Sequence, residues 1–131
     1  GGAAAVDRYN GSRLSSEQNV IVVSVSYRLG ALGFLALPDF TGGGSGGMNG
    51  IYDIIVGLQW VRENVAYFGG RKEDVTIFGE SSGSYASCTL CVSPAATGLF
   101  TRAILESGPC IGGPPGKGWG PANLTRGLAI G

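Results

Sequence analysis

One serine lies in a setting that is typical of a reactive nucleophile. Ser81 is the central residue of a G-x-S-x-G motif at 79–83, directly after the apolar stretch Val75–Phe78. A serine hydroxyl is a poor nucleophile unless it is held exposed beside a base. A sharp turn between a strand and a helix exposes the hydroxyl and points the positive end of the helix dipole at the reacting centre. We therefore predict that Ser81 has a strained backbone at the start of a helix; a chance match in a chain with 25 glycines is the alternative.

The two glycines of this motif have a predicted role of their own. A sharp turn crowds the backbone on both sides of Ser81. Gly79 and Gly83 are expected to relieve that crowding, because glycine has no Cβ atom.

A second informative feature is that the chain contains no histidine. A serine hydrolase needs a base to accept the proton of the serine, and that base is nearly always histidine. The chain thus carries a nucleophile without its base. Either it is a piece of a longer enzyme, or it is a relative that has lost the chemistry.

Composition excludes several functional classes. The 131 residues are enough for one domain, and 44% of them are apolar, so a core is expected. Nine basic and nine acidic residues balance, which gives no indication of a nucleic acid or an anionic membrane as partner. No apolar run approaches the roughly 20 residues that a membrane span needs. The oligomeric state is left open.

The cysteines predict neither a metal site nor a cofactor. Cys88 and Cys91 form a C-x-x-C pair, but zinc sites of this kind need histidines or a second such pair. We expect both to be reduced thiols, buried on the helix that follows Ser81.

Localisation is left open as well. Two N-x-[ST] sequons occur, at Asn10 and at Asn123. They permit secretion or residence in the lumen of the endoplasmic reticulum without establishing either, and the chain begins with no signal-peptide pattern.

The hydrophobic pattern predicts an α/β fold. Strands alternate with helices, which favours βαβ units in a parallel sheet. The predicted strand Val20–Tyr27 is expected to be buried on both faces, because it is apolar nearly throughout. The predicted helix at 50–68 has one apolar stripe, with Asn49 as its N-cap and Gly69-Gly70 at its end. The predicted elements are the buried strand Val20–Tyr27, a glycine-rich loop at 28–50, the helix at 50–68, the strand Val75–Phe78, a helix from Ser82 to Val92 and the strand Arg102–Glu106.

Six short sequence motifs follow one another along the chain. They are VSYRLG at 25–30, NGIYD at 49–53, LQWVRENV at 58–65, FGG at 68–70, VTIFGES at 75–81 and LFTRAILESG at 99–108. In this combination the chain resembles the type-B carboxylesterases, which include the cholinesterases, over most of residues 9–109.

The resemblance implies a fold and a mechanism. The fold is a partial α/β-hydrolase fold, with a parallel sheet and βαβ units around a nucleophile elbow. The mechanism is hydrolysis of a small-molecule carboxylic ester through an acyl-serine intermediate at Ser81, in a Ser–acid–His triad. The acid and the histidine lie, in the family, beyond the point where this chain stops. The alternative is a catalytically inactive, cholinesterase-like adhesion or binding protein, although such a protein has no need of an intact nucleophile.

Further site residues follow from the same resemblance. The backbone N–H of Ser82 matches one oxyanion-hole donor, where most members have alanine. Gly2 and Ala3 match the other donors, although a coincidental glycine-rich terminus is an equal alternative. Glu80 matches an acidic residue that tunes local electrostatics, or it is a turn residue chosen for solubility. Ser107 matches a serine that supports the network of the acid, or it is a plain strand-end residue.

The resemblance also implies how much of the fold is present. Residues 1–131 would form one partial type-B carboxylesterase domain that lacks the N-terminal strands and the C-terminal half. One of the lacking strands would lie between Val20–Tyr27 and Val75–Phe78. We therefore expect Val20–Tyr27 to be separated from the other two strands, and the isolated chain to fold poorly or to aggregate.

Overall fold

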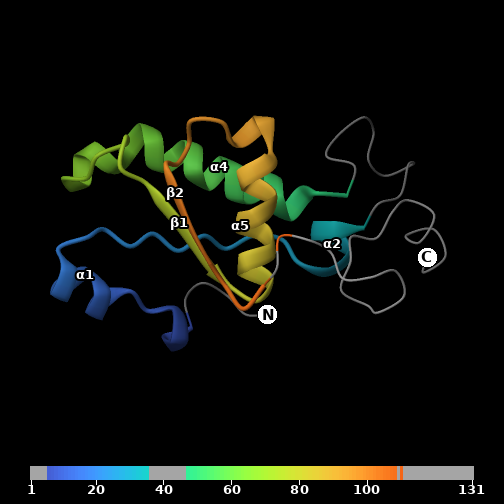
Figure 1. The fold of residues 1–131 in the computed structure, drawn as a ribbon, viewed down its shortest axis with the longest axis horizontal. Helices are drawn as coiled ribbons and strands as arrows, with labels where there is room; N and C mark the ends of the chain where they lie inside the picture. Colours follow the sequence, from blue (N-terminus) through green and yellow to red (C-terminus); the bar gives the residue numbers. More distant parts are fainter. Residues whose placement is uncertain (1–5, 36–46, 109, 111–131) are drawn as a thin grey trace.

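A computed structural model describes residues 6–35, 47–108 and 110 of the chain (Figure 1). The elements in chain order are η1 (Asp7–Tyr9), α1 (Ser12–Gln18), α2 (Gly30–Phe34), α4 (Asn49–Asn64), η2 (Val65–Phe68), β1 (Thr76–Glu80), α5 (Ser82–Val92), η3 (Pro94–Ala96) and β2 (Arg102–Glu106).

The centre of the fold is one βαβ unit. Strands β1 and β2 pair in parallel, with Thr76 opposite Arg102 and Glu80 opposite Glu106, and helix α5 connects them (Figure 1). The predicted α/β class is confirmed, as are the bounds of α5 and β2. Strand β1 begins one residue later than predicted and continues to Glu80, because its pairing with β2 extends that far.

The hydrophobic core joins both long helices to β1. Its most buried members come from α4, β1, α5 and the turn before β2: Ile51, Ile55, Leu58, Ile77, Ala86, Leu90, Ala96 and Leu99. Strand β2 contributes none of them, since all five of its residues are exposed. The βαβ unit is therefore anchored from one side only, through α4 and the inward face of β1.

Helix α4 has the predicted apolar stripe, and the predicted stop at Gly69 is confirmed, but the helix begins one residue earlier than predicted and its last turn is the separate 3-10 helix η2. The helix gives way to the short η2 turn at Val65, and Gly69 then ends it with a left-handed φ of 83°. Phe68, expected on the stripe, is 63% exposed. The N-cap prediction is wrong: Met48 is the N-cap, and Asn49 is the first helical residue. The side chain of Asn49 instead donates a hydrogen bond to the carbonyl of Leu32 at 3.1 Å.

The predicted strand Val20–Tyr27 is not a strand in this structure. It lies outside the two-stranded sheet, so the expected separation from β1 and β2 is confirmed. The expectation that it is buried on both faces is wrong, since Val20, Ile21 and Val23 are each 43% exposed. A strand needs a hydrogen-bonded neighbour, and no described segment pairs with this one.

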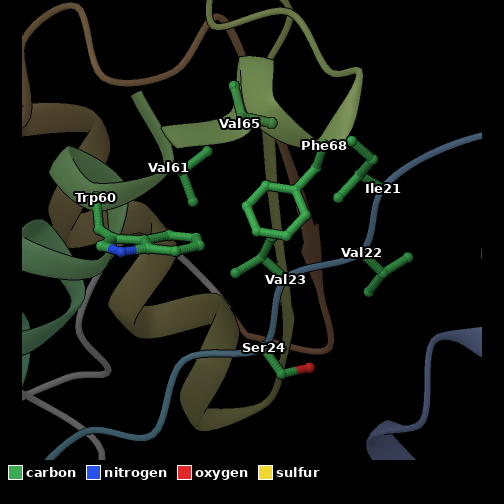
Figure 2. Close-up of a pocket in the computed structure, with 8 residues that line it drawn as sticks. All are labelled: Ile21, Val22, Val23, Ser24, Trp60, Val61, Val65 and Phe68. Atoms are coloured by element: carbon green, nitrogen blue, oxygen red, sulfur yellow. The ribbon is translucent and has the colours of Figure 1, made fainter. Parts of the chain in front are cut away.

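An apolar hollow of about 290 Å³ lies where this segment meets the helical layer. Figure 2 shows residues 21–24 on one side and side chains of α4 and η2 on the other. The lining residues are Ile21, Val22, Val23, Ser24, Trp60, Val61, Val65 and Phe68. No titratable side chain lines this hollow, so we assign it no chemistry.

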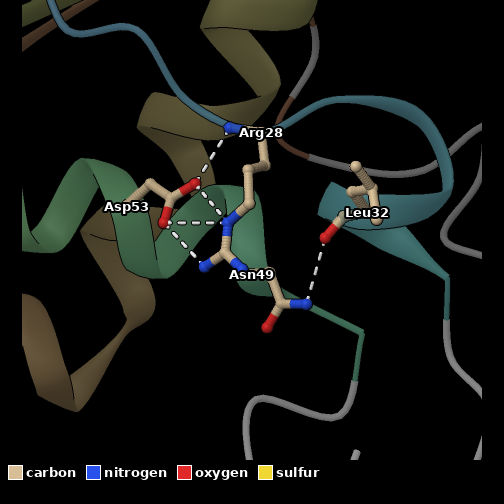
Figure 3. Close-up of polar contacts among 4 residues, drawn as sticks. All are labelled: Arg28, Leu32, Asn49 and Asp53. Atoms are coloured by element: carbon tan, nitrogen blue, oxygen red, sulfur yellow. Dashed lines mark hydrogen bonds and ion pairs between the residues drawn. The ribbon is translucent and has the colours of Figure 1, made fainter. Parts of the chain in front are cut away.

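One ion pair ties the segment to α4 (Figure 3). The guanidinium of Arg28 binds both carboxylate oxygens of Asp53, with Nη2–Oδ1 at 2.8 Å. The backbone N–H of Arg28 also donates a hydrogen bond to Oδ2 of Asp53 at 2.9 Å. The short helix α2, which replaces part of the predicted loop, follows directly. These hydrogen bonds from Arg28 lower the pKa of Asp53 to about 2.

The unpaired segment leads to a prediction on amide exchange. In the 131-residue chain, amides of Ile21–Val25 should exchange with solvent much faster than those of β1 and β2, because only the latter form a ladder. Hydrogen exchange read by mass spectrometry measures this, and size-exclusion chromatography should show self-association through the unpaired backbone. A monodisperse monomer with equal protection in all three segments would contradict the prediction.

The ion pair leads to a prediction on acid stability. The folded pKa of Asp53 is below its unfolded value of about 3.9, so the stabilisation is complete above that pH and is lost as the pH falls towards 2. Asp53→Asn should flatten the dependence of the unfolding free energy on pH between about 5 and 2. Glu73→Gln is the matched control, because its exposed carboxylate makes only a long surface contact, 3.9 Å from Lys72, and the substitution leaves the Arg28–Asp53 pair in place. An unchanged slope in Asp53→Asn, measured by urea unfolding of the protein that contains this chain, would refute the assignment.

Candidate active site

Ser81 lies at the turn between β1 and α5. It is half-buried and is the N-cap of α5, with φ 53° and ψ −115°. This combination lies outside the regions that non-glycine residues favour, and such strain costs of the order of 1–3 kcal/mol. The predicted strained backbone at a helix start is thus confirmed.

Two backbone hydrogen bonds hold this conformation. The N–H of Ser81 donates to the carbonyl of Glu106 at 2.9 Å, which continues the ladder one step beyond β1. Its carbonyl accepts from the N–H of Tyr85 at 3.1 Å, which begins the helix. Strand pairing on one side and helix formation on the other therefore offset the strain.

Crowding at the turn explains one of the two motif glycines. A Cβ atom on Gly79 would lie 2.3 Å from the carbonyl carbon of Gly83, a distance that real contacts do not reach. A Cβ atom on Gly83 would have no neighbouring atom within 4 Å, apart from its chain neighbours and the backbone of its own helix. The prediction that glycine relieves crowding is therefore confirmed for Gly79 and wrong for Gly83. The backbone of Gly83 lies close to Gly79, but there is room for a Cβ atom on Gly83 itself.

The first residues of α5 provide unpaired donors beside Ser81. Ser82 is exposed and opens the helix, so its backbone N–H has no partner within the helix. An anion next to Ser81 would meet this N–H and the positive end of the helix dipole. Gly2 and Ala3, the other predicted donors, lie outside the described residues.

The two predicted supporting residues follow the same edge of the sheet. Glu80 is the last residue of β1, exposed, and stands opposite Glu106 in the register. Ser107 directly follows β2 and, like Ser81, has a left-handed φ, here 54°. Both parallel strands therefore end in a strained serine at their carboxyl ends.

Sequence reasoning missed a further pair, Ser84 and Gly108. Ser84 has no exposed surface, and its hydroxyl donates to the carbonyl of Gly108 at 2.8 Å. A Cβ atom on Gly108 would lie 2.8 Å from the carbonyl oxygen of Ser81, so only glycine fits there. The glycine at 108 is visible in the sequence, but only the structure shows that it contacts the turn.

The cysteine prediction is wrong for the thiol state of Cys88 and for the burial of Cys91, whereas the free thiol at Cys91 is as predicted. Cys88 is buried as expected, but it forms a disulfide bond with Cys110, and Cys91 is a free, exposed thiol. Cys110 follows β2 closely, and the parallel pairing brings the end of β2 to the start of α5. The disulfide thus ties the segment after β2 to the helix that begins at Ser81, in addition to the Ser84–Gly108 hydrogen bond.

The described residues hold no cluster of histidine, cysteine, aspartate or glutamate that suits a metal ion. None of the helices in the described ranges has the length and apolar character to cross a membrane.

The glycine geometry leads to a paired prediction. Gly79→Ala should destabilise the fold by about 1–3 kcal/mol, because the new methyl group forces the backbone of Gly83 to move. Gly83→Ala should be neutral or stabilising by up to about 1 kcal/mol, since alanine has the higher helix propensity. Urea unfolding of the protein that contains this chain measures both variants. Equal effects of the two substitutions would show that the contact at Gly79 is not what the turn requires.

Comparison with known proteins identifies the family. Residues 1–113 match the model of the carboxylesterase family. The para-nitrobenzyl esterase of Bacillus subtilis (strain 168) is 47% identical over 107 residues, which are 82% of this chain and 22% of that protein. The acetylcholinesterase of Danio rerio is also 47% identical over 107 residues, 82% of this chain and 17% of the enzyme.

Solved structures agree in fold. A thermophilic PNB esterase superposes with a TM-score of 0.77 at 46% identity, over 82% of this chain and 22% of that structure. A carboxylesterase of Geobacillus stearothermophilus gives a TM-score of 0.76 at 40% identity, over 82% of this chain and 23% of that structure. The chain thus spans about a fifth of the length of these relatives, as their covered shares of 22% and 23% show. The predicted partial α/β-hydrolase fold is confirmed, and the chain belongs to the carboxylesterase family.

Proposed function

We propose that this chain carries the nucleophile of a carboxylic ester hydrolase, and that the nucleophile is Ser81. The observation that supports this most directly is the backbone of Ser81, held at φ 53° and ψ −115° between a strand and a helix. A protein that only binds a partner gains nothing from this strain. A hydrolase gains an exposed hydroxyl at a helix N-terminus.

The reaction would proceed in two steps. The hydroxyl of Ser81 attacks the ester carbonyl while a histidine takes its proton, and the alcohol leaves from an acyl-serine intermediate. Water, activated by the same histidine, then releases the carboxylic acid. The 131 residues contain no histidine, so this base must come from outside them. The resemblance to the family implies the same for the acid that orients it.

Backbone N–H groups would stabilise the oxyanion that forms in both steps. The donor within the described residues is the N–H of Ser82, and those of Gly2 and Ala3 would complete the set. Glu80 would adjust the electrostatics at the end of β1, and Ser107 would support the network of the acid. In this proposal residues 1–131 are one partial domain of the esterase, and its substrate is a small-molecule carboxylic ester.

Two measurements on the whole reading frame that encodes this chain test the proposal. A fluorophosphonate probe should label Ser81, as located by peptide mapping, and Ser81→Ala should lower hydrolysis of p-nitrophenyl acetate by at least about 10³-fold. Ser82→Ala is the matched control: it keeps the backbone donor, so activity should stay close to that of the unsubstituted protein. The 131-residue chain alone should show no Ser81-dependent turnover.

The alternative predicts a different result. An inactive, adhesion-type member of the family would neither react with the probe at Ser81 nor turn over the ester. That result, with a folded whole protein, would overturn the proposed function. Robust Ser81-dependent turnover by the 131-residue chain would overturn the assignment of the base to residues outside it.

A further inference from the structure

We propose that Ser84 is a positioning residue for ester hydrolysis, whose hydroxyl holds the strained conformations of Ser81 and Ser107 in place. The proposal rests on the proposed function of Ser81. Ser84 has no exposed surface, so it does not touch an ester itself and acts only through its neighbours. Three features support this role: the burial of Ser84, the ring of hydrogen bonds that it closes, and the contact between its partner and Ser81.

The first feature is a fully buried hydroxyl on a helix. A buried hydroxyl costs free energy unless it is hydrogen-bonded, and alanine has the higher helix propensity, so the packing of α5 alone favours alanine at this position. The hydroxyl of Ser84 donates to the carbonyl of Gly108 at 2.8 Å. Both residues belong to the described βαβ unit, and any further chain packed on that unit leaves Ser84 no less buried. The hydroxyl is therefore explained by its bond to the end of β2.

The second feature is a ring that two hydrogen bonds close between the start of α5 and the end of β2. At one end the N–H of Ser81 donates to the carbonyl of Glu106 at 2.9 Å. At the other end the hydroxyl of Ser84 donates to the carbonyl of Gly108. The ring contains Ser81 and Ser107, whose φ angles of 53° and 54° are both left-handed. Such strain persists only where the surroundings determine it, so removal of the Ser84 hydroxyl lets the backbone of Ser107 relax.

The third feature is the contact of Gly108 with the turn. An ideal Cβ atom on Gly108 would lie 2.8 Å from the carbonyl oxygen of Ser81 and 2.7 Å from Cβ of Ser84. Gly108 therefore fills the space between these two residues, and a shift of Gly108 changes what packs on the carbonyl of Ser81. The disulfide between Cys88 and Cys110 still binds the segment to α5 when the hydroxyl of Ser84 is removed. We therefore expect a local displacement, which slows the reaction, and not the release of the whole segment.

Acylation kinetics of the protein from the whole reading frame test the proposal. In Ser84→Ala, the first-turnover release of p-nitrophenol at saturating p-nitrophenyl acetate should be slower by about 10-fold to 10²-fold, as expected for a misplaced reacting group. The rate is expressed per site titrated with a fluorophosphonate, so any loss of folded protein does not enter it. The ester concentration that gives half of this rate should change less than about twofold, because Ser84 does not contact the ester.

A matched control and a structural measurement accompany the kinetics. Ser87 is also a buried serine of α5, but the carbonyl of Gly108 accepts its hydrogen bond from Ser84. Ser87→Ala thus removes a buried hydroxyl from the same helix and leaves the ring closed, so its acylation rate should equal that of the unsubstituted protein. A crystal structure of Ser84→Ala should show φ of Ser107 outside the left-handed region while the disulfide remains intact.

The outcomes separate this role from the proposed function. An unsubstituted protein that hydrolyses no ester overturns the proposed function, and this role with it. An active unsubstituted protein whose Ser84→Ala variant keeps its acylation rate overturns this role alone. An equal loss of rate in Ser87→Ala also overturns it, because the packing of α5 in general would then explain the effect. A Ser84→Ala protein without titratable sites overturns it as well, because the hydroxyl would then be required for folding and not for position.

Discussion

The structure depends on how closely the backbone can approach itself where β1 turns into α5. An ideal Cβ atom at Gly79 would lie 2.3 Å from the carbonyl carbon of Gly83, so the chain closes this turn only with glycine at 79. The tight turn places Ser81, two residues after Gly79, in a backbone conformation that serine rarely adopts. Everything that makes Ser81 a candidate nucleophile follows from this approach.

A strained turn persists only where its surroundings determine it fully. Here β2 supplies the carbonyl of Glu106, which holds the N–H of Ser81. The segment after β2 is then bound back to α5 twice, through the hydroxyl of Ser84 and through the disulfide of Cys88. Because these attachments lie on both sides of the turn, the elbow, the helix and the end of β2 form one unit. That arrangement suits a site whose backbone donors must be in place before the charge develops.

The N-terminal part of the described chain shows what happens when such support is lacking. Residues 20–27 have the composition of a buried strand, but their apolar side chains are half-exposed and line a hollow against α4 and η2. The ion pair of Arg28 with Asp53 fixes the end of the segment to α4, and it does so with charged groups at the surface. It secures position without supplying the ladder of hydrogen bonds that would make the segment a strand.

The sequence by itself determined the elements whose partners are close along the chain. Periodicity located α4, apolar stretches indicated β1 and β2, and the spacing of glycines around Ser81 identified the elbow, because each of these signals is local. Helices α1 and α2 were not predicted. Only the tertiary structure decided that Val20–Tyr27 is not a strand, that Cys88 pairs with Cys110, and that Ser84 and Gly108 brace the turn. Those outcomes depend on which segments meet in space. A strand needs a hydrogen-bonded neighbour, and a disulfide needs two thiols that lie close together. The contact between Ser84 and Gly108 depends on how α5 packs against the end of β2. Residue types alone do not determine any of these three outcomes.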